Sequence, residues 1–170
     1  MSNNQAQKIY SELYKMITSL SVESSEAKNI RAQFRHAVST VPGENPMLWG
    51  WLLEHLEPEL QGKEENISYA EYAIYITLSM FAIGPRNDNE HTIAEAAAIA
   101  EIKRNKLTSV ETATDIKEMQ TALRGLIKLI DSKGYAFSYG KLAEDIYYWQ
   151  FNKTNIARKW EREYARKEKK

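Results

Sequence analysis

The sequence carries a row of arginines near its C-terminus. Arg158, Arg162 and Arg166 recur every four residues, and Lys159 stands beside the first of them. Side chains four residues apart lie on one face of an α-helix, so we call these three arginines the arginine stripe and expect them on one side of a helix. Guanidinium groups pair with phosphates, and each such contact releases counterions from a nucleic-acid backbone. The chemistry that this spacing indicates is polyanion binding.

Other basic residues are spaced in a similar way. Lys28, Arg31 and Arg35 stand at i, i+3 and i+7, on a helix face that excludes Ile30 and Phe34. The remaining candidates for phosphate contact are Lys103, Arg104, Lys106, Arg124 and Lys128. A phosphate backbone is bound by charge that several elements deliver to one side of a protein. All these basic residues are therefore candidate nucleic-acid contacts.

Aromatic residues are interleaved with basic ones between Tyr147 and Lys167. Ile156, Trp160 and Tyr164 repeat at helical spacing opposite the arginine stripe. Base-stacking rings would stand on the same face as the arginines, so we predict that the large aromatics are core residues. The alternative to a polyanion-binding surface is a terminal helix that packs on the core and whose basic outer face contacts only solvent.

The chain carries no formal net charge, with 23 Lys and Arg against 23 Asp and Glu, but the charge is unevenly distributed. Residues 1–100 contain 7 basic and 13 acidic side chains, whereas residues 101–170 contain 16 and 10. Glu163 stands four residues from both Lys159 and Lys167, and these pairs would lower the local field. The uneven division predicts a field with a direction; its alternative is chance segregation of solvated side chains.

Residues that could perform catalysis or bind a metal are scattered. His36, His55 and His91 fall in three different segments, and His55 lacks the HExxH spacing of a zinc site. The sequence contains no GxGxxG, Walker or GxSxG motif. We therefore expect no catalytic residue, no metal and no cofactor, and the prediction turns from catalysis to binding.

Length and composition predict one domain. The 170 residues are 43% hydrophobic, enough for a single sizeable core over 1–170. The absence of Cys excludes disulfides and thiolate metal sites. The N-terminal residues are polar, and the longest apolar run, 69–83, is too short and too polar to span a bilayer. We expect a cytoplasmic protein without membrane contact, with a frayed basic tail at about 165–170.

Helical periodicity extends over almost the whole chain. Apolar residues at helical spacing predict helices near 9–20, 27–37, 46–56, 68–83, 92–106, 116–130, 138–149 and 154–166. The segment 69–84 is apolar nearly all round and is predicted to lie at the centre. No segment alternates long enough for a strand. The predicted fold class is all-α, a compact single-domain bundle of about seven to nine helices.

Capping residues mark several of these helix ends. Asn45 before Pro46 predicts a helix start, and Ser68 with Glu71 forms a capping box. Further caps are expected at Thr92, with Glu95 as a weaker pair, at Gly134, Ser138 and Thr154.

The order of short motifs resembles a known family. IRAQFRHA at 30–37 is followed by a long apolar helix, then by TIAEAAAIAE, ALRGLIKLI, a helix ending in IYYW, and RKWEREY. This order resembles the CasB family, the small subunit of the type I-E CRISPR surveillance complex called Cascade. The resemblance covers nearly the whole chain, and ALRGLIKLI to RKWEREY is its best part.

Two positions differ from the family pattern. Members commonly carry an Arg-Arg-Phe-like element after the Ala-rich helix, whereas this chain reads KRNKL, which keeps the charge and replaces the aromatic with Leu107. An Asp-Trp pair often precedes the penultimate helix, whereas this chain has Ser138 and Tyr139. We predict that the second difference changes only a cap and a core residue.

The resemblance implies a non-enzymatic role. Small subunits of this family are all-helical, usually occur as a pair, and contact CasC-type backbone subunits and the CasA-type large subunit. They help to hold the crRNA–target heteroduplex and the displaced DNA strand. By match to the family's basic positions, Arg31, Arg35 and Arg124 are the strongest candidates that the resemblance provides. The alternatives are a helical protein–protein adaptor without nucleic-acid contact and, third, a helical enzyme that depends on one of the histidines.

Overall fold

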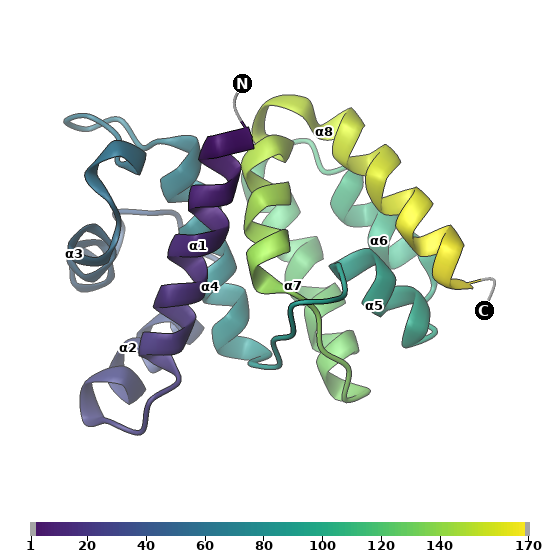
Figure 1. Ribbon diagram of the computed structural model, residues 1–170, viewed down its shortest axis with the longest axis horizontal. Coiled ribbons are helices and arrows are strands. Elements are labelled where there is room, and N and C mark those ends of the chain that lie inside the picture. The colour runs from purple at the N-terminus through teal and green to yellow at the C-terminus, as the bar shows by residue number, and fades with distance from the viewer. Residues whose placement is uncertain (1–2, 169–170) are drawn as a thin grey trace.

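The structure, a computed structural model, describes residues 3–168. Within them the chain forms eight α-helices and one short 3-10 helix (Figure 1). The elements are α1 (Asn3–Leu20), α2 (Ser25–His36), α3 (Pro46–His55), η1 (Pro58–Leu60), α4 (Tyr69–Ile83), α5 (Ile93–Ile99), α6 (Arg104–Glu111), α7 (Ile116–Ser132) and α8 (Tyr139–Glu168). An isolated bridge between Asn87 and Phe137 is the only β-type pairing among the described residues. The all-α prediction is confirmed.

Helix α4 is the central element. It begins with a complete capping box, in which Ser68 and Glu71 each accept a backbone N–H of the other. Its side chains are buried over most of its length because α1, α2, α7 and α8 all contact it. The buried apolar residues of the other helices join α4 in one continuous core, so the molecule folds around a single centre.

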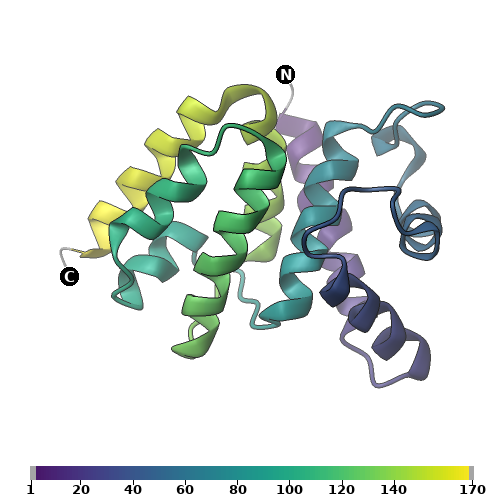
Figure 2. The same cartoon turned by 180° about the vertical axis from the view of Figure 1, so that it is seen from behind.

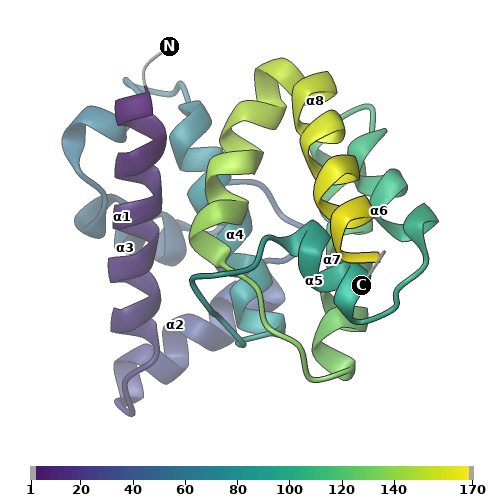
Figure 3. The same ribbon diagram turned by 45° about the vertical axis from the view of Figure 1, so that its right-hand side comes forward.

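Helix α8 turns back on itself. Asn152 has non-helical backbone angles, φ −152° and ψ 58°, and separates two helical halves. The first half lies beside α1 and α4, where Tyr147 bonds Gln5 and Gln150 bonds the carbonyl of Tyr69. The second half lies over α5 (Figure 3). The sequence predicted two helices here, but the predicted cap at Thr154 is wrong, because the break falls at Asn152.

The single helix predicted over 92–106 is also wrong. Helix α5 ends at Ile99, Glu101 adopts a left-handed φ of 57°, and α6 begins at Arg104. Between them Ile102 turns inward to full burial, and its carbonyl accepts the Tyr164 hydroxyl at 2.6 Å. No Gly or Pro marks this reversal, so tertiary contacts determine it against local helix propensity.

The other predicted caps are confirmed. Asn45 accepts the first backbone N–H groups of α3, and Thr92 and Glu95 form both halves of a capping box. Gly134 follows α7 with a φ of 81°. Ser138 accepts the N–H of Lys141 at 3.1 Å, and Tyr139 is a fully buried core residue. No helix within 3–168 is long and apolar enough to cross a membrane.

Candidate nucleic-acid interface

The arginine stripe lies on the outer face of the second half of α8. Arg158, Arg162 and Arg166 are all exposed, whereas the opposite stripe of Ile156, Trp160 and Tyr164 is buried. Within residues 3–168 none of the three guanidinium groups has a hydrogen bond or ion pair. Three unpaired cations therefore stand in a row on one helix face.

Lys159 differs from its arginine neighbours. Its ammonium donates to both carboxylate oxygens of Asp145 at 3.1 Å and to Glu163 at 3.4 Å. Trp160 donates its indole N–H to the same Asp145 at 2.7 Å. Burial raises the pKa of the Asp145 carboxyl, even though Lys159 and Trp160 oppose the shift. Because Asp145 precedes Asn152 and Lys159 follows it, this network clamps the two halves of α8 together.

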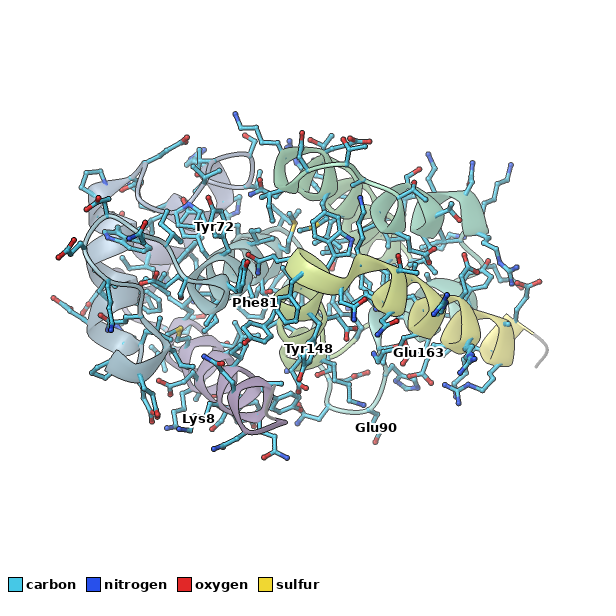
Figure 4. All side chains as sticks on the ribbon, turned by 90° about the horizontal axis from the view of Figure 1, so that it is seen from above. Lys8, Tyr72, Phe81, Glu90, Tyr148 and Glu163 are labelled. Carbon is cyan, nitrogen blue, oxygen red and sulfur yellow. The ribbon has the colours of Figure 1, made fainter. Side chains whose placement is uncertain are left out.

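Figure 4 shows Glu163 on the second half of α8, the side of the clamp that follows the turn. Burial alone would lower the pKa of Lys159, but the carboxylates of Asp145 and Glu163 raise it above its usual value. The ammonium therefore stays charged and internally paired. Lys159 is the least available of the basic residues that the sequence proposed on α8.

The basic residues at the start of α6 also include both an ion-paired side chain and unpaired ones. Arg104 contacts Glu161 at 3.4 Å and Glu168 at 3.2 Å, and its guanidinium carbon lies 5.0 Å from the centre of the Tyr164 ring. Lys103 and Lys106 are exposed, without an ion pair among the described residues. The first turn of α6 receives no side-chain cap, so its N–H groups add positive potential to that of the two lysines.

Helix α7 adds two more exposed cations. Arg124 and Lys128 are four residues apart on its outer side, and no hydrogen bond or ion pair engages them within 3–168. Helix α6 contacts both α7 and α8, and Figure 2 shows α7, α6 and the second half of α8 side by side. We call seven cations on or next to these three helices, each without an ion pair within 3–168, the basic surface: Lys103, Lys106, Arg124, Lys128, Arg158, Arg162 and Arg166.

The basic residues of α2 lie elsewhere. Lys28 pairs with Glu23 at 3.2 Å. Arg31 donates to the carbonyls of Leu20 and Val22, where α1 ends, and Arg35 donates to the last turn of α4. Figure 1 places α2 at the opposite end of the molecule from the second half of α8. The structure therefore does not bring this group together with the basic surface, and it gives Arg31 a role in joining α1 to α2.

A family model for the CRISPR-associated protein Cse2 matches residues 30–164 of the chain. The chain belongs to the Cse2 family. Its fold is similar to crystal structures of CasB from Thermobifida fusca (TM-score 0.73, 17% identity, 94% of this chain and 96% of that one) and CasB from Thermus thermophilus (TM-score 0.69, 19% identity, 97% and 99%). No curated protein sequence matches it.

One acidic pair in this Cse2 chain was not predicted. Glu111 ends α6 on its buried face and is only 5% exposed, and one of its carboxyl oxygens has no hydrogen-bond partner within the described residues. Burial, followed by the nearby Glu161 carboxylate, raises the pKa of Glu111 to about 8, although Arg104 opposes the shift. The spacing in the sequence indicates this burial, because Glu111 stands four residues after the buried Leu107 and therefore lies on the same helix face.

The three histidines stay apart in the Cse2 fold. His55 stacks on Trp51 with ring centres 4.2 Å apart, His91 contacts Asp88 at 3.0 Å, and His36 is exposed. Within residues 3–168 no group of three or more His, Asp or Glu side chains could hold a metal ion. The absence of catalysis and of a cofactor stays a prediction.

Proposed function

We propose that this chain is the non-catalytic small subunit of a type I-E Cascade complex, where it binds the backbones of crRNA and target DNA and stabilises the R-loop. Membership of the Cse2 family supports a place among CRISPR proteins. The observation that carries the proposal is the basic surface, whose cations are unpaired within 3–168 and lie on three neighbouring helices. Arginines that were all paired with carboxylates would instead have favoured a helix whose basic face contacts only solvent.

The physics of R-loops suits such a surface. Forming an R-loop exchanges a DNA duplex for an RNA–DNA duplex of similar stability. Protein contacts to the backbone can therefore shift the equilibrium towards the R-loop. Each arginine that neutralises a phosphate contributes affinity without reading the sequence. The stripe arginines stand on a helix whose position the Lys159 clamp fixes, so only their side chains have to be ordered on binding.

The partners in this proposal are CasC-type backbone subunits, the CasA-type large subunit and a second copy of the chain. The acidic residues of the first hundred support a surface for basic partners. Glu54 in α3, Glu57 just before η1 and Glu59 in η1 are exposed, and Figure 1 shows α3 at the opposite side of the molecule from the second half of α8. Charge reversal at Glu57, Glu59 and Glu64 should weaken assembly, and unchanged assembly would contradict partner contact there.

The test is fluorescence anisotropy of labelled single-stranded DNA and RNA across a salt series. We expect binding that weakens steeply with salt and is abolished when Arg158, Arg162 and Arg166 are changed to Glu. For single strands, the slope of log affinity against log salt becomes shallower by roughly 0.7 for each phosphate that the protein no longer neutralises. Lys15→Glu is the control, because Lys15 is exposed on α1, pairs with Glu12 at 3.5 Å and is not one of the candidate contacts.

A helical adaptor without nucleic-acid contact is the competing function. It predicts that the stripe variants change nothing in the anisotropy assay and that removal of the chain after Tyr164 changes only solubility. Equal affinities of the stripe variants and the wild type would favour it. Retained helical content by circular dichroism is required in each variant, because an unfolded variant would lose binding for another reason.

A further inference from the structure

The turn of α8 carries aromatic rings that the core does not cover. Tyr69, at the start of α4, is 53% exposed, and Phe151, the last residue before the turn, is 39% exposed. Tyr148 is half-buried beside them. We call these three residues the aromatic tip. Figure 4 looks down on this end of the molecule, where Tyr148 and Tyr72 are labelled. The other large aromatics of this stretch, Tyr147, Trp149, Trp160 and Tyr164, are buried as predicted.

The rings of the aromatic tip are held in place by the scaffold. The ring centre of Phe151 lies 5.4 Å from that of Tyr69 and 5.7 Å from that of Tyr148. Buried Tyr147 packs edge-on against Phe151 at 5.3 Å, and its hydroxyl donates to Gln5 of α1. Gln150 donates to the carbonyl of Tyr69 at 2.8 Å and ties α4 to α8. These rings are therefore pre-positioned, which reduces the entropy lost when something binds them.

The segment around the aromatic tip carries positive charge, which favours the binding of a polyanion. Residues 146–160 contain no acidic residue, and of their three basic residues Lys153 and Arg158 have no ion pair within 3–168, whereas Lys159 is paired with Asp145 and Glu163. Residues 151–155 are all exposed and offer the amides of Asn152 and Asn155. The arginine stripe begins at Arg158 in the same segment. A strand that passes over the tip can therefore continue along the stripe.

A groove of about 380 Å³ adjoins the tip. Tyr69, Tyr72 and Trp149 form aromatic walls, and Asp115 lies on its lining. The carboxylate of Asp115 accepts the N–H of Glu118 as the cap of α7, and a carboxylate repels phosphate. The groove therefore suits an uncharged, flat group rather than a phosphate.

We propose that the aromatic tip stacks unpaired bases of a single-stranded nucleic acid whose backbone follows the arginine stripe. The proposal rests on the proposed function and specifies its ligand as a single strand. Bases stack on exposed aromatic rings whatever their sequence, next to cations that follow the backbone. The tip lies at the turn of α8 and the stripe follows it on the second half of α8, whereas an apolar protein partner would not require the stripe.

The test uses the full chain and three labelled probes of equal length: a single strand of mixed sequence, the same strand made abasic, and a duplex. The test variant is Tyr69→Ala with Phe151→Ala. Stacking is worth roughly 1–3 kcal/mol per base, so we expect affinity for the normal single strand to fall about tenfold or more. Affinity for the abasic strand and the duplex should stay unchanged. Tyr14→Ala is the matched control, because Tyr14 is 47% exposed on α1.

A second variant and a second signal distinguish the loss of base stacking from the loss of the folded structure. Phe151→Leu keeps an apolar side chain but removes the ring, and it should weaken binding of the normal single strand selectively. A 2-aminopurine base in the strand should be quenched by wild type and less by the tip variants, because stacking quenches this base. Arg162→Gln should weaken binding of all three probes, since it removes a cation that faces phosphate.

Each outcome decides between the two proposals. A selective loss of affinity for the normal single strand supports base stacking. No loss, or an equal loss for all three probes, overturns it but leaves the proposed function intact if Arg162→Gln still weakens binding. Failure of wild type to bind any probe at low salt overturns both. Unchanged DNA affinity with impaired binding to a partner subunit would overturn base stacking and assign the tip to protein docking.

Discussion

Replacement of Glu111 by Gln should change how stability depends on pH. Glu111 is buried between α6 and α8, and burial together with the Glu161 carboxylate raises its pKa from 4.5 to about 8. In the folded state the carboxyl therefore keeps its proton up to about pH 8. In the unfolded chain it loses the proton near pH 4.5. The folded state binds more protons in that window, so its stability falls as pH rises from 4.5 to 8.

The size of the effect follows from the difference between the two pKa values. A pKa difference of one is worth about 1.4 kcal/mol, so the full window from 4.5 to about 8 corresponds to at most about 4–5 kcal/mol. Water entry and movement of Arg104 relieve part of this, and we expect a loss of about 2–4 kcal/mol for wild type. Gln cannot ionise, and its amide can still donate to Glu161. Glu111→Gln should therefore equal wild type near pH 4.5 and exceed it by about 2–4 kcal/mol at pH 9.

Urea unfolding at a series of pH values between 5 and 9 measures this difference. Asp145, Glu144 and Glu163 also have raised pKa values because of burial, but their contribution is common to both proteins and cancels in the comparison. Glu54→Gln removes an exposed carboxylate on α3 and should change stability by less than about 0.5 kcal/mol throughout. Parallel curves for Glu111→Gln and wild type would refute the reasoning, because Glu111 would then be ionised in the folded state.

Two further substitutions test the packing around α8. Lys159→Met leaves Asp145 buried without its cation. Because the Lys159 side chain is itself 44% exposed, we expect the free energy of unfolding in urea to fall by about 1–3 kcal/mol. A variant as stable as wild type would show that the clamp is dispensable. Gly140→Ala places a Cβ 2.6 Å from the ring of Tyr10 and should cost about 1–3 kcal/mol. Gly125→Ala meets nothing within 4 Å on α7 and should instead stabilise by up to about 1 kcal/mol in thermal melts. Equal melting temperatures for the two alanine variants would contradict this contrast.

Most of the fold could be predicted because the signals were local. The capping box at Ser68 and Glu71 and the turn at Gly134 were predicted from residues at most three apart. The arginine stripe followed from a spacing of four, and its exposure is confirmed. Such features depend on backbone hydrogen bonds and helical geometry, which neighbouring residues determine.

The errors fall where distant residues decide. The predicted helix over 92–106 is broken because Ile102 is buried and bonded to Tyr164, about sixty positions further along. Lys159 looked like one more basic residue of the last helix, and only the return of α8 brings it against Asp145. Arg31 likewise donates to carbonyls at the end of α1.

By itself the sequence determined the helical class, the central apolar helix, most helix ends and the row of arginines, because these depend on the period of the helix and on nearby residues. Only the tertiary structure decided which cations stay unpaired, since a carboxylate such as Asp145 or Glu161 neutralises a cation only when folding brings it within reach. It also decided that Phe151 and Tyr69 meet at the surface, whereas the burial of Trp160 followed from its spacing. Charge pairing and burial depend on distances between segments, and those distances exist only once the chain has folded.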